Sequence, residues 1–129
     1  MKPHTIIRLA AILGALAVAM GAFGAHALND FLIETNRLDT YETAVKYHFY
    51  HTLALLLIAL FAERHAAKIL RWSAILMVAG IIIFSGSLYT LCFTGITILG
   101  AITPIGGLCL IAGWLTLLFS IPKSDQKTL

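Results

Sequence analysis

The chain of 129 residues is 60% hydrophobic and only 12% charged, whereas soluble domains average roughly 45–50% and ~25%. Four membrane-spanning helices of ~20 residues each would leave too little chain for a second soluble domain. The net charge of +3 is the difference between nine Lys and Arg and six Asp and Glu, and nine basic residues are too few for a basic nucleic-acid-binding stripe. Two cysteines provide neither a disulfide framework nor a four-ligand zinc site. We therefore expect one all-α membrane domain over residues 1–129, with the lipid bilayer as partner and no nucleic acid.

Four apolar runs predict the transmembrane helices, because each is long enough to cross a bilayer. They cover residues 7–28, 44–62, 69–91 and 98–119. The connection after the second run is short and basic, and the connection after the third is shorter still and uncharged. Neighbouring helices must then run antiparallel, so we expect a four-helix bundle.

A cleavable signal peptide is the rival interpretation of the first run. Lys2 and Arg8 would supply its positively charged start, and Ala25-His26-Ala27 matches the small-x-small pattern of a signal-peptidase site. The apolar run continues through Leu28, however, so we expect the first run to be kept as a transmembrane helix.

The longest connection, residues 29–43, follows the first run. It mixes apolar and charged side chains and is too short and too charged to span the membrane. An amphipathic segment in the headgroup region and a plain ordered loop both fit this pattern. Asp39 with Glu42 three residues later resembles a capping box at the start of the second helix. Glu42 also lies one turn before Lys46, the favoured order for an ion pair.

The positive charges are divided unevenly between the two ends of the predicted bundle. Seven Lys and Arg lie on the side of the termini, and two lie on the other side. Because cytoplasmic segments are enriched in Lys and Arg, we expect both termini to face the cytoplasm and the acidic first connection to face outward. The first side has Lys2, Arg8, Arg64, Lys68, Arg71, Lys123 and Lys127, and the second has Arg37 and Lys46.

Small residues form stripes on the first and fourth helices. On the first helix, Ala and Gly recur at spacings of four, three, four and three from Ala10 to Gly24. Such stripes let helix backbones approach closely, which matters in lipid because the hydrophobic effect does not pull helices together there. We expect these faces to pack within the bundle or against a partner. The predicted packing glycines are Gly14, Gly21, Gly24, Gly106, Gly107 and Gly113.

Polar side chains inside the predicted helices gather at one level, in the outer half of the bundle. Polar and ionisable groups are costly in lipid, so such residues mark candidate functional sites. At ~100° per residue, Tyr47, His48 and His51 are predicted to share one face of the second helix. Ser85 and Ser87 are predicted to point in nearly opposite directions, so that only one faces the bundle centre. The candidate binding residues are His26, Tyr47, His51, Ser85, Ser87 and Thr103.

Three interpretations of this outer group stay open. Its members can form hydrogen bonds between helices, or line a small polar cavity for water, a proton path or a small ligand. A metal site built on His48-x-x-His51 with His26 is the third, but no acidic residue or cysteine is placed to complete it. No nucleophile elbow surrounds either serine and no acid is visible to orient a histidine, so we expect neither an enzyme nor a bound cofactor or metal.

Four segments, in order along the chain, resemble the motifs of a known family. The likeness extends from Arg8 to Phe119 and is to the domain of unknown function 423 family of small bacterial inner-membrane proteins, which resembles the eukaryotic transmembrane protein 256 homologues. The resemblance implies a four-helix protein of the inner (plasma) membrane with no assigned activity, and it leaves His48 outside the family motifs. The segments are Gly21-Ala-Phe-Gly-Ala-His26, Tyr47-x-x-Tyr-His51-Thr-Leu-Ala, Phe84-Ser-Gly-Ser-Leu-Tyr89, and Thr103-Pro-x-Gly-Gly107 with Ala112-Gly-Trp114.

For function, we expect a non-enzymatic accessory or structural membrane protein that acts through helix packing, against other membrane proteins or a second copy of itself. The alternative is binding of a small ligand, proton or ion at the outer polar group. Copurification of a stoichiometric partner would favour the first function. A stability transition near the histidine pH range that is lost on His26→Gln or His51→Gln would favour the second.

Overall fold

The computed structural model describes residues 1–64 and 68–120, which fold into helices joined by short turns. The described residues form no strand, in agreement with the predicted all-α class. Residues 65–67 of the second connection, together with Lys123 and Lys127, lie outside the described residues. The elements are α1 Pro3–Ala25, α2 Asn29–Glu34, α3 Leu38–Arg64, α4 Lys68–Gly80, the π-helix η1 Ile81–Ser85, α5 Gly86–Thr94 and α6 Leu99–Ser120.

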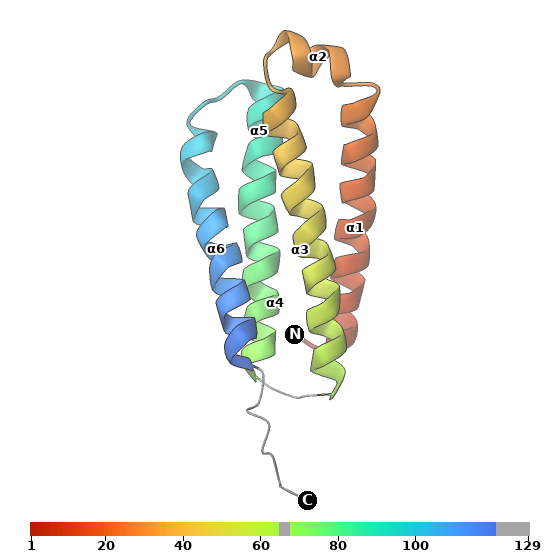
Figure 1. Ribbon diagram of the computed structural model, residues 1–129, viewed down its shortest axis with the longest axis vertical. Coiled ribbons are helices and arrows are strands. Elements are labelled where there is room, and N and C mark those ends of the chain that lie inside the picture. Colours follow the sequence, from red (N-terminus) through yellow and green to blue (C-terminus); the bar gives the residue numbers. More distant parts are fainter. Residues whose placement is uncertain (65–67, 121–129) are drawn as a thin grey trace, which may run out of the picture.

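Four helical segments among the described residues are long and apolar enough to cross a membrane. They are α1, α3, the continuous segment α4-η1-α5, and α6. Helices suit such apolar sequences because every backbone polar group must find its partner inside the chain when lipid surrounds it. Figure 1 shows an antiparallel bundle, with α2 at one end and with the start of α1 and the end of α6 at the other. The predicted four-helix membrane fold is therefore confirmed.

α3 and the α4-η1-α5 segment form the centre of the bundle. α1 packs mainly on α3, whereas α6 packs mainly on α4 and η1. In the apolar window of each helical segment, 44% of the residues are buried for both central segments, against 17% for α1 and 22% for α6. The two flanking helices therefore turn most of their surface outward.

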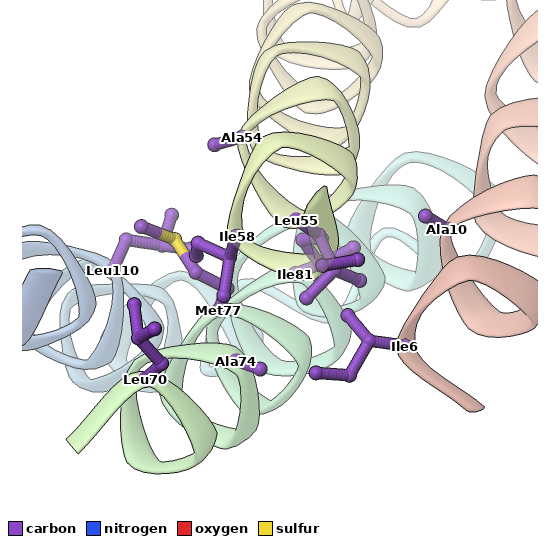
Figure 2. Close-up of a cluster of buried hydrophobic side chains, with 11 residues drawn as sticks. Ile6, Ala10, Ala54, Leu55, Ile58, Leu70, Ala74, Met77, Ile81 and Leu110 are labelled. Atoms are coloured by element: carbon purple, nitrogen blue, oxygen red, sulfur yellow. The ribbon is translucent and has the colours of Figure 1, made fainter. Parts of the chain in front are cut away.

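The larger apolar core lies in the half of the bundle away from α2. Ile6 of α1, Ile58 of α3 and Met77 of α4 have no exposed surface, and Leu110 of α6 packs with them (Figure 2). Interdigitated side chains of this kind give each helix van der Waals contacts that loose lipid chains do not match. This core joins all four membrane-spanning segments.

The second membrane helix begins at Leu38, earlier than the predicted residue 44. One face of its first turns is buried: Tyr41 is 1% exposed, and its hydroxyl donates to the Met20 carbonyl oxygen at 2.7 Å. The capping-box prediction was wrong, because Asp39 lies inside the first turn of the helix. There its negative charge interacts favourably with the positive end of the helix dipole.

The first membrane helix ends at Ala25 rather than at residue 28, and the long connection contains the short helix α2. Leu32 of α2 is fully buried against Tyr41, while Phe31 and Ile33 are exposed apolar side chains. This arrangement agrees with an amphipathic segment rather than an irregular loop. The chain then turns into α3 through Asn36, whose left-handed φ of 55° is one that asparagine tolerates.

No feature of the sequence predicted the π-helix η1. π-helices are rare, are mostly single turns inside α-helices, and often occur at functional sites. α6 approaches η1 so closely that a Cβ atom at Gly106 would overlap the backbone of Phe84. The side chain of Ser85, the last residue of η1, faces the opposite way and bonds to α3. The π-turn is therefore held between α6 and α3.

Candidate functional site

The structure divides the predicted outer group among separate contacts. Ser85 is 1% exposed, and its hydroxyl donates to the backbone carbonyl oxygen of Ala44 on α3 at 2.9 Å. The bond links η1 to α3 and satisfies a hydroxyl that would be costly to leave unpaired in an apolar interior. Ser85 therefore acts as a joint between two helices in this structure.

Ser87 bonds on the opposite side of the same segment. Its Oγ lies 2.7 Å from the Thr103 Oγ1 of α6, and Ser87 is also in reach of the Phe84 carbonyl oxygen at 2.9 Å. The Thr103 hydroxyl lies 3.2 Å from the Leu99 carbonyl oxygen. Either hydroxyl can therefore donate to the other, because the one that accepts can donate its own proton to a carbonyl oxygen of its own helix. The predicted opposite directions of the two serines are confirmed. The expectation that only one would face the interior was wrong, because the third membrane segment packs on α3 with one side and on α6 with the other.

Tyr47 and His51 form a stacked pair on α3. Their ring centroids lie 5.7 Å apart, and the Tyr47 ring also stacks on Phe84 of η1 at 4.7 Å. The His51 Nδ1 lies 2.8 Å from the Tyr47 carbonyl oxygen. A carbonyl oxygen only accepts, so Nδ1 carries a proton and donates it to this bond. Trp114 of α6 meets the His51 ring edge-on, at 6.2 Å between centroids.

His48 points toward a different neighbour, although it lies only ~60° around α3 from His51. Its Nδ1 lies 3.3 Å from the Tyr89 hydroxyl of α5. A step of three residues turns the helix by ~60° away from a full turn, which is enough to send His48 to Tyr89 and His51 to Trp114. The His48-x-x-His51 pair therefore does not converge as a metal site would require.

His48 also holds the one buried side-chain nitrogen or oxygen without a hydrogen-bond partner among the described residues. The residue is 5% exposed, and its Nε2 is the unpaired atom. Leu13 of α1 and His48 line the same shallow hollow. The sequence pattern indicated His48 only as part of a possible metal site with His51 and His26, and the family motifs left it out, so it was not among the predicted binding residues.

His26 lies apart from the other candidates, at the carboxyl end of α1. It is the residue that follows the last turn, where its backbone N–H donates to the Ala22 carbonyl oxygen at 3.2 Å, and its side chain is exposed. A role for His26 in a binding site stays a prediction.

Two hydrogen bonds between helices were not predicted from the sequence. The Tyr41 hydroxyl bonds to Met20 of α1, and the Ser73 hydroxyl of α4 donates to the Gly113 carbonyl oxygen of α6 at 2.7 Å. Ser73 has no exposed surface. Ser73 is a lone serine in an apolar run, at the end of the bundle that was predicted to be almost wholly apolar. That isolation is the sequence feature that could have indicated a hydrogen bond between helices. The predicted capping box placed Tyr41 in the opening turn of the second helix, but no local feature of the sequence indicated its partner on α1.

The predicted packing glycines lie where helices meet. A Cβ atom at Gly24 would overlap the Tyr41 ring, one at Gly106 would overlap the Phe84 backbone, and one at Gly113 would lie 3.2 Å from Met77. The same atom would have more space at the other three positions. At Gly14 it would lie 3.5 Å from Thr52, at Gly21 3.4 Å from Val45, and at Gly107 3.7 Å from the Phe84 ring.

The predicted ion pair of Glu42 and Lys46 is confirmed, with 3.1 Å between Nζ and the carboxylate oxygen. Both side chains are more than half exposed, so the pair contributes little to stability by itself. The pair instead indicates position in the membrane. Charged groups are costly in lipid, so the pair marks the level at which α3 leaves the hydrocarbon core.

Four apolar membrane segments joined by hydroxyl-to-carbonyl bonds define an integral membrane protein of the four-helix class. Residues 20–107 match the family described as protein of unknown function (DUF423), and the chain belongs to this family. The resemblance seen in the sequence motifs is thereby confirmed.

The relatives are membrane proteins whose names state no activity. A UPF0382 membrane protein of Staphylococcus haemolyticus is 46% identical over 121 residues, covering 91% of this chain and 98% of its own. The UPF0382 membrane protein YwdK of Bacillus subtilis is 44% identical over 118 residues, covering 91% and 95%. The UPF0382 inner membrane protein YgdD of Escherichia coli is 35% identical over 127 residues, covering 98% and 96%. No solved structure matches the chain.

Proposed function

We propose that this protein is a non-enzymatic accessory or structural subunit of the inner membrane that acts through helix contacts. The observation that carries the proposal is the uneven burial of the four membrane segments, with only 22% of the α6 window and 17% of the α1 window buried. The buried hydroxyls at the helix joints bond to other helices rather than gather around a reaction centre. The outward faces are the parts of the molecule left for partners.

The outward face of α6 is the docking surface we propose for another membrane protein or a second copy of this chain. Leu108 is 66% exposed and Leu118 61% exposed, with Ile105, Ile111 and Leu115 also exposed along the same helix. In lipid, such a face gains from a partner only through close packing, so the contact must be specific in shape.

Site-specific photocrosslinking in native membranes tests the docking surface. A photoreactive residue at Leu108 should give one discrete protein adduct in stoichiometric yield, and Ile111→Trp on the same face should abolish it. Val18, exposed on α1, serves as the matched position on the other flanking helix. Adducts with lipid alone at Leu108, or an adduct indifferent to Ile111→Trp, would contradict the proposal.

We also propose that both termini face the cytoplasm. Lys2, Arg8, Lys68 and Arg71 support this orientation, because they lie at the end of the bundle opposite α2. In a variant with Cys92 and Cys109 replaced by alanine, a cysteine at the exposed Thr35 should react with an impermeant maleimide added outside intact cells. Labelling only after the cells are opened would reverse the orientation.

Binding of a small ligand, proton or ion is the second candidate function. The unpaired Nε2 of buried His48 favours it, because a buried polar atom without a partner marks a place where a ligand or water can complete the bonding. Proteoliposomes with an internal pH-sensitive dye test the part of this proposal that concerns protons and ions. A flux that disappears with His48→Gln and persists with His51→Gln supports this function. Equal dye responses in the wild-type protein, in both variants and in empty vesicles count against it.

A further inference from the structure

Two hollows lie along the seam between α1 and α3, on the same side of the helix pair. The one nearer α2 has a volume of about 280 Å³ and the deeper one about 210 Å³. Their lining residues continue each other at seven-residue spacing, which keeps them on one face of each helix. We call the two hollows together the seam groove, which is defined by Gly21, Gly14 and Ile7 on α1 and by Glu42, Phe49 and Leu56 on α3.

The groove is hollow because α1 carries small residues along it. Gly14 and Gly21 have no side chain, and the exposed Ala11 and Ala25 add only a methyl group each. The glycine stripe therefore does more than bring α1 against α3. It also leaves the two hollows beside the contact, which larger side chains would fill.

The two hollows together extend along α3 for somewhat more than the hydrocarbon half-thickness of the bilayer. The exposed Glu42–Lys46 pair stands at its rim, at the level where charged side chains reach the headgroups. From Glu42 to Leu56 the helix runs ~21 Å at ~1.5 Å per residue. Half of a ~30 Å hydrocarbon core is ~15 Å, so the groove accommodates a glycerol backbone and most of an acyl chain.

The volumes favour an acyl chain over a helix. An α-helix with its side chains is ~10–12 Å across, and ligand pockets for drug-sized molecules begin near ~300 Å³. Hollows of about 280 and 210 Å³ in a row suit a slender chain instead.

The charges at the rim select the headgroup. The α2 end of the bundle carries four acidic residues and two basic ones, which disfavours a lipid with net negative charge. Lys46 has three donors and Glu42 has several acceptor positions, so both keep bonding capacity after pairing with each other. The four acids are Asp30, Glu34, Asp39 and Glu42, and the two basic residues are Arg37 and Lys46.

We infer that the seam groove binds a phospholipid with a phosphoethanolamine headgroup. Lys46 donates to the phosphate, Glu42 accepts from the primary ammonium, and one acyl chain runs over Gly21 and Gly14 toward Leu56. The site is separate from the outward face of α6 on which the proposed function rests.

Native mass spectrometry of the full-length protein tests the inference. The protein is reconstituted in nanodiscs with equal amounts of phosphatidylethanolamine, phosphatidylglycerol and phosphatidylcholine of identical acyl chains, and the retained lipids are counted. Phosphatidylethanolamine should be retained roughly three- to tenfold over each of the others, the gain expected for two exposed charge contacts. Phosphatidylcholine is the sharper comparison, because its quaternary ammonium has no N–H to donate to Glu42. Equal retention of the three lipids overturns the inference.

Matched variants locate the site. Glu42→Gln and Lys46→Gln should each reduce the preference, whereas Glu34→Gln, which removes an exposed carboxylate of α2 at the same end, should keep it. Ala25→Leu should fill the hollow near α2 and abolish retention, while Ala22→Leu, on an exposed position of α1 outside the groove, should not. Preference unchanged by Glu42→Gln and Lys46→Gln overturns the headgroup assignment. A dimer that Ala25→Leu converts to monomer, with lipid retention unaltered, would show that a second copy occupies the groove and would also overturn the inference.

Discussion

The Ser85 hydroxyl lies 2.9 Å from the carbonyl oxygen of Ala44, so the last residue of the π-helix is bonded to the opposite central helix. Ala44 has no exposed surface and Ser85 is 1% exposed, which keeps this bond away from competing donors. The contact fixes the rotation of η1 against α3. It also sets which side of the segment carries Ser87 toward α6.

Replacing Ser85 with alanine should destabilise the bundle by ~0.6 kcal/mol, with an upper value of ~1.7 kcal/mol, the range for hydrogen bonds between membrane helices. Thr90→Ala is the matched control, because the exposed Thr90 hydroxyl bonds only within its own helix, to the Gly86 carbonyl oxygen. Reversible unfolding in mixed micelles measures both. A Ser85→Ala protein as stable as Thr90→Ala would show that the bond contributes nothing to the fold.

Neighbouring glycines on α6 should respond differently to the same substitution. At Gly106 an added Cβ atom would overlap the Phe84 backbone, so Gly106→Ala should cost ~1–3 kcal/mol or shift η1. At Gly107 the same atom lies 3.7 Å from the Phe84 ring, an ordinary contact, so Gly107→Ala should be neutral or stabilise by up to ~1 kcal/mol through helix propensity. Unfolding free energies of the two variants decide the point, and equal values would contradict the close approach of α6 to η1.

The Tyr41 hydroxyl should tie α1 to α3. Tyr41→Phe removes its 2.7 Å bond to the Met20 carbonyl oxygen while keeping the ring that packs against Gly24. We expect a loss of ~0.5–1.5 kcal/mol. Tyr50→Phe is the control, since Tyr50 is 59% exposed on the same helix. Protease sensitivity of the α1–α3 connection should rise in Tyr41→Phe alone; the same rise in both variants would refute the joint.

Ser87 and Thr103 should be energetically coupled, because their hydroxyls lie 2.7 Å apart across α5 and α6. In a double-mutant cycle of Ser87→Ala and Thr103→Val, the double variant should cost less than the sum of the single variants by ~0.6 kcal/mol. Unfolding in mixed micelles again provides the free energies. Strict additivity would mean that each hydroxyl is satisfied by its own helix carbonyl alone, Phe84 for Ser87 and Leu99 for Thr103.

The class of protein and the number of membrane helices could be predicted from the sequence, because both depend on local properties. An apolar run of ~20 residues has few stable alternatives to a membrane helix, since its backbone groups must bond to each other in lipid. Helical periodicity likewise placed Ser85 and Ser87 on opposite sides of one helix and Lys46 one turn from Glu42. The start of α3 was predicted too late, because the burial of Tyr41 against α1 depends on a distant segment and leaves no local signal.

The tertiary structure alone decided which polar side chain meets which partner. His48 and His51 are three residues apart in sequence, yet one faces Tyr89 of α5 and the other faces Trp114 of α6. The sequence by itself determined a four-helix membrane protein with small-residue stripes and a polar outer half. Whether those stripes close on a neighbouring helix, as at Gly106, or leave a groove, as at Gly21, follows from helix rotation and spacing, which are set by packing between distant segments.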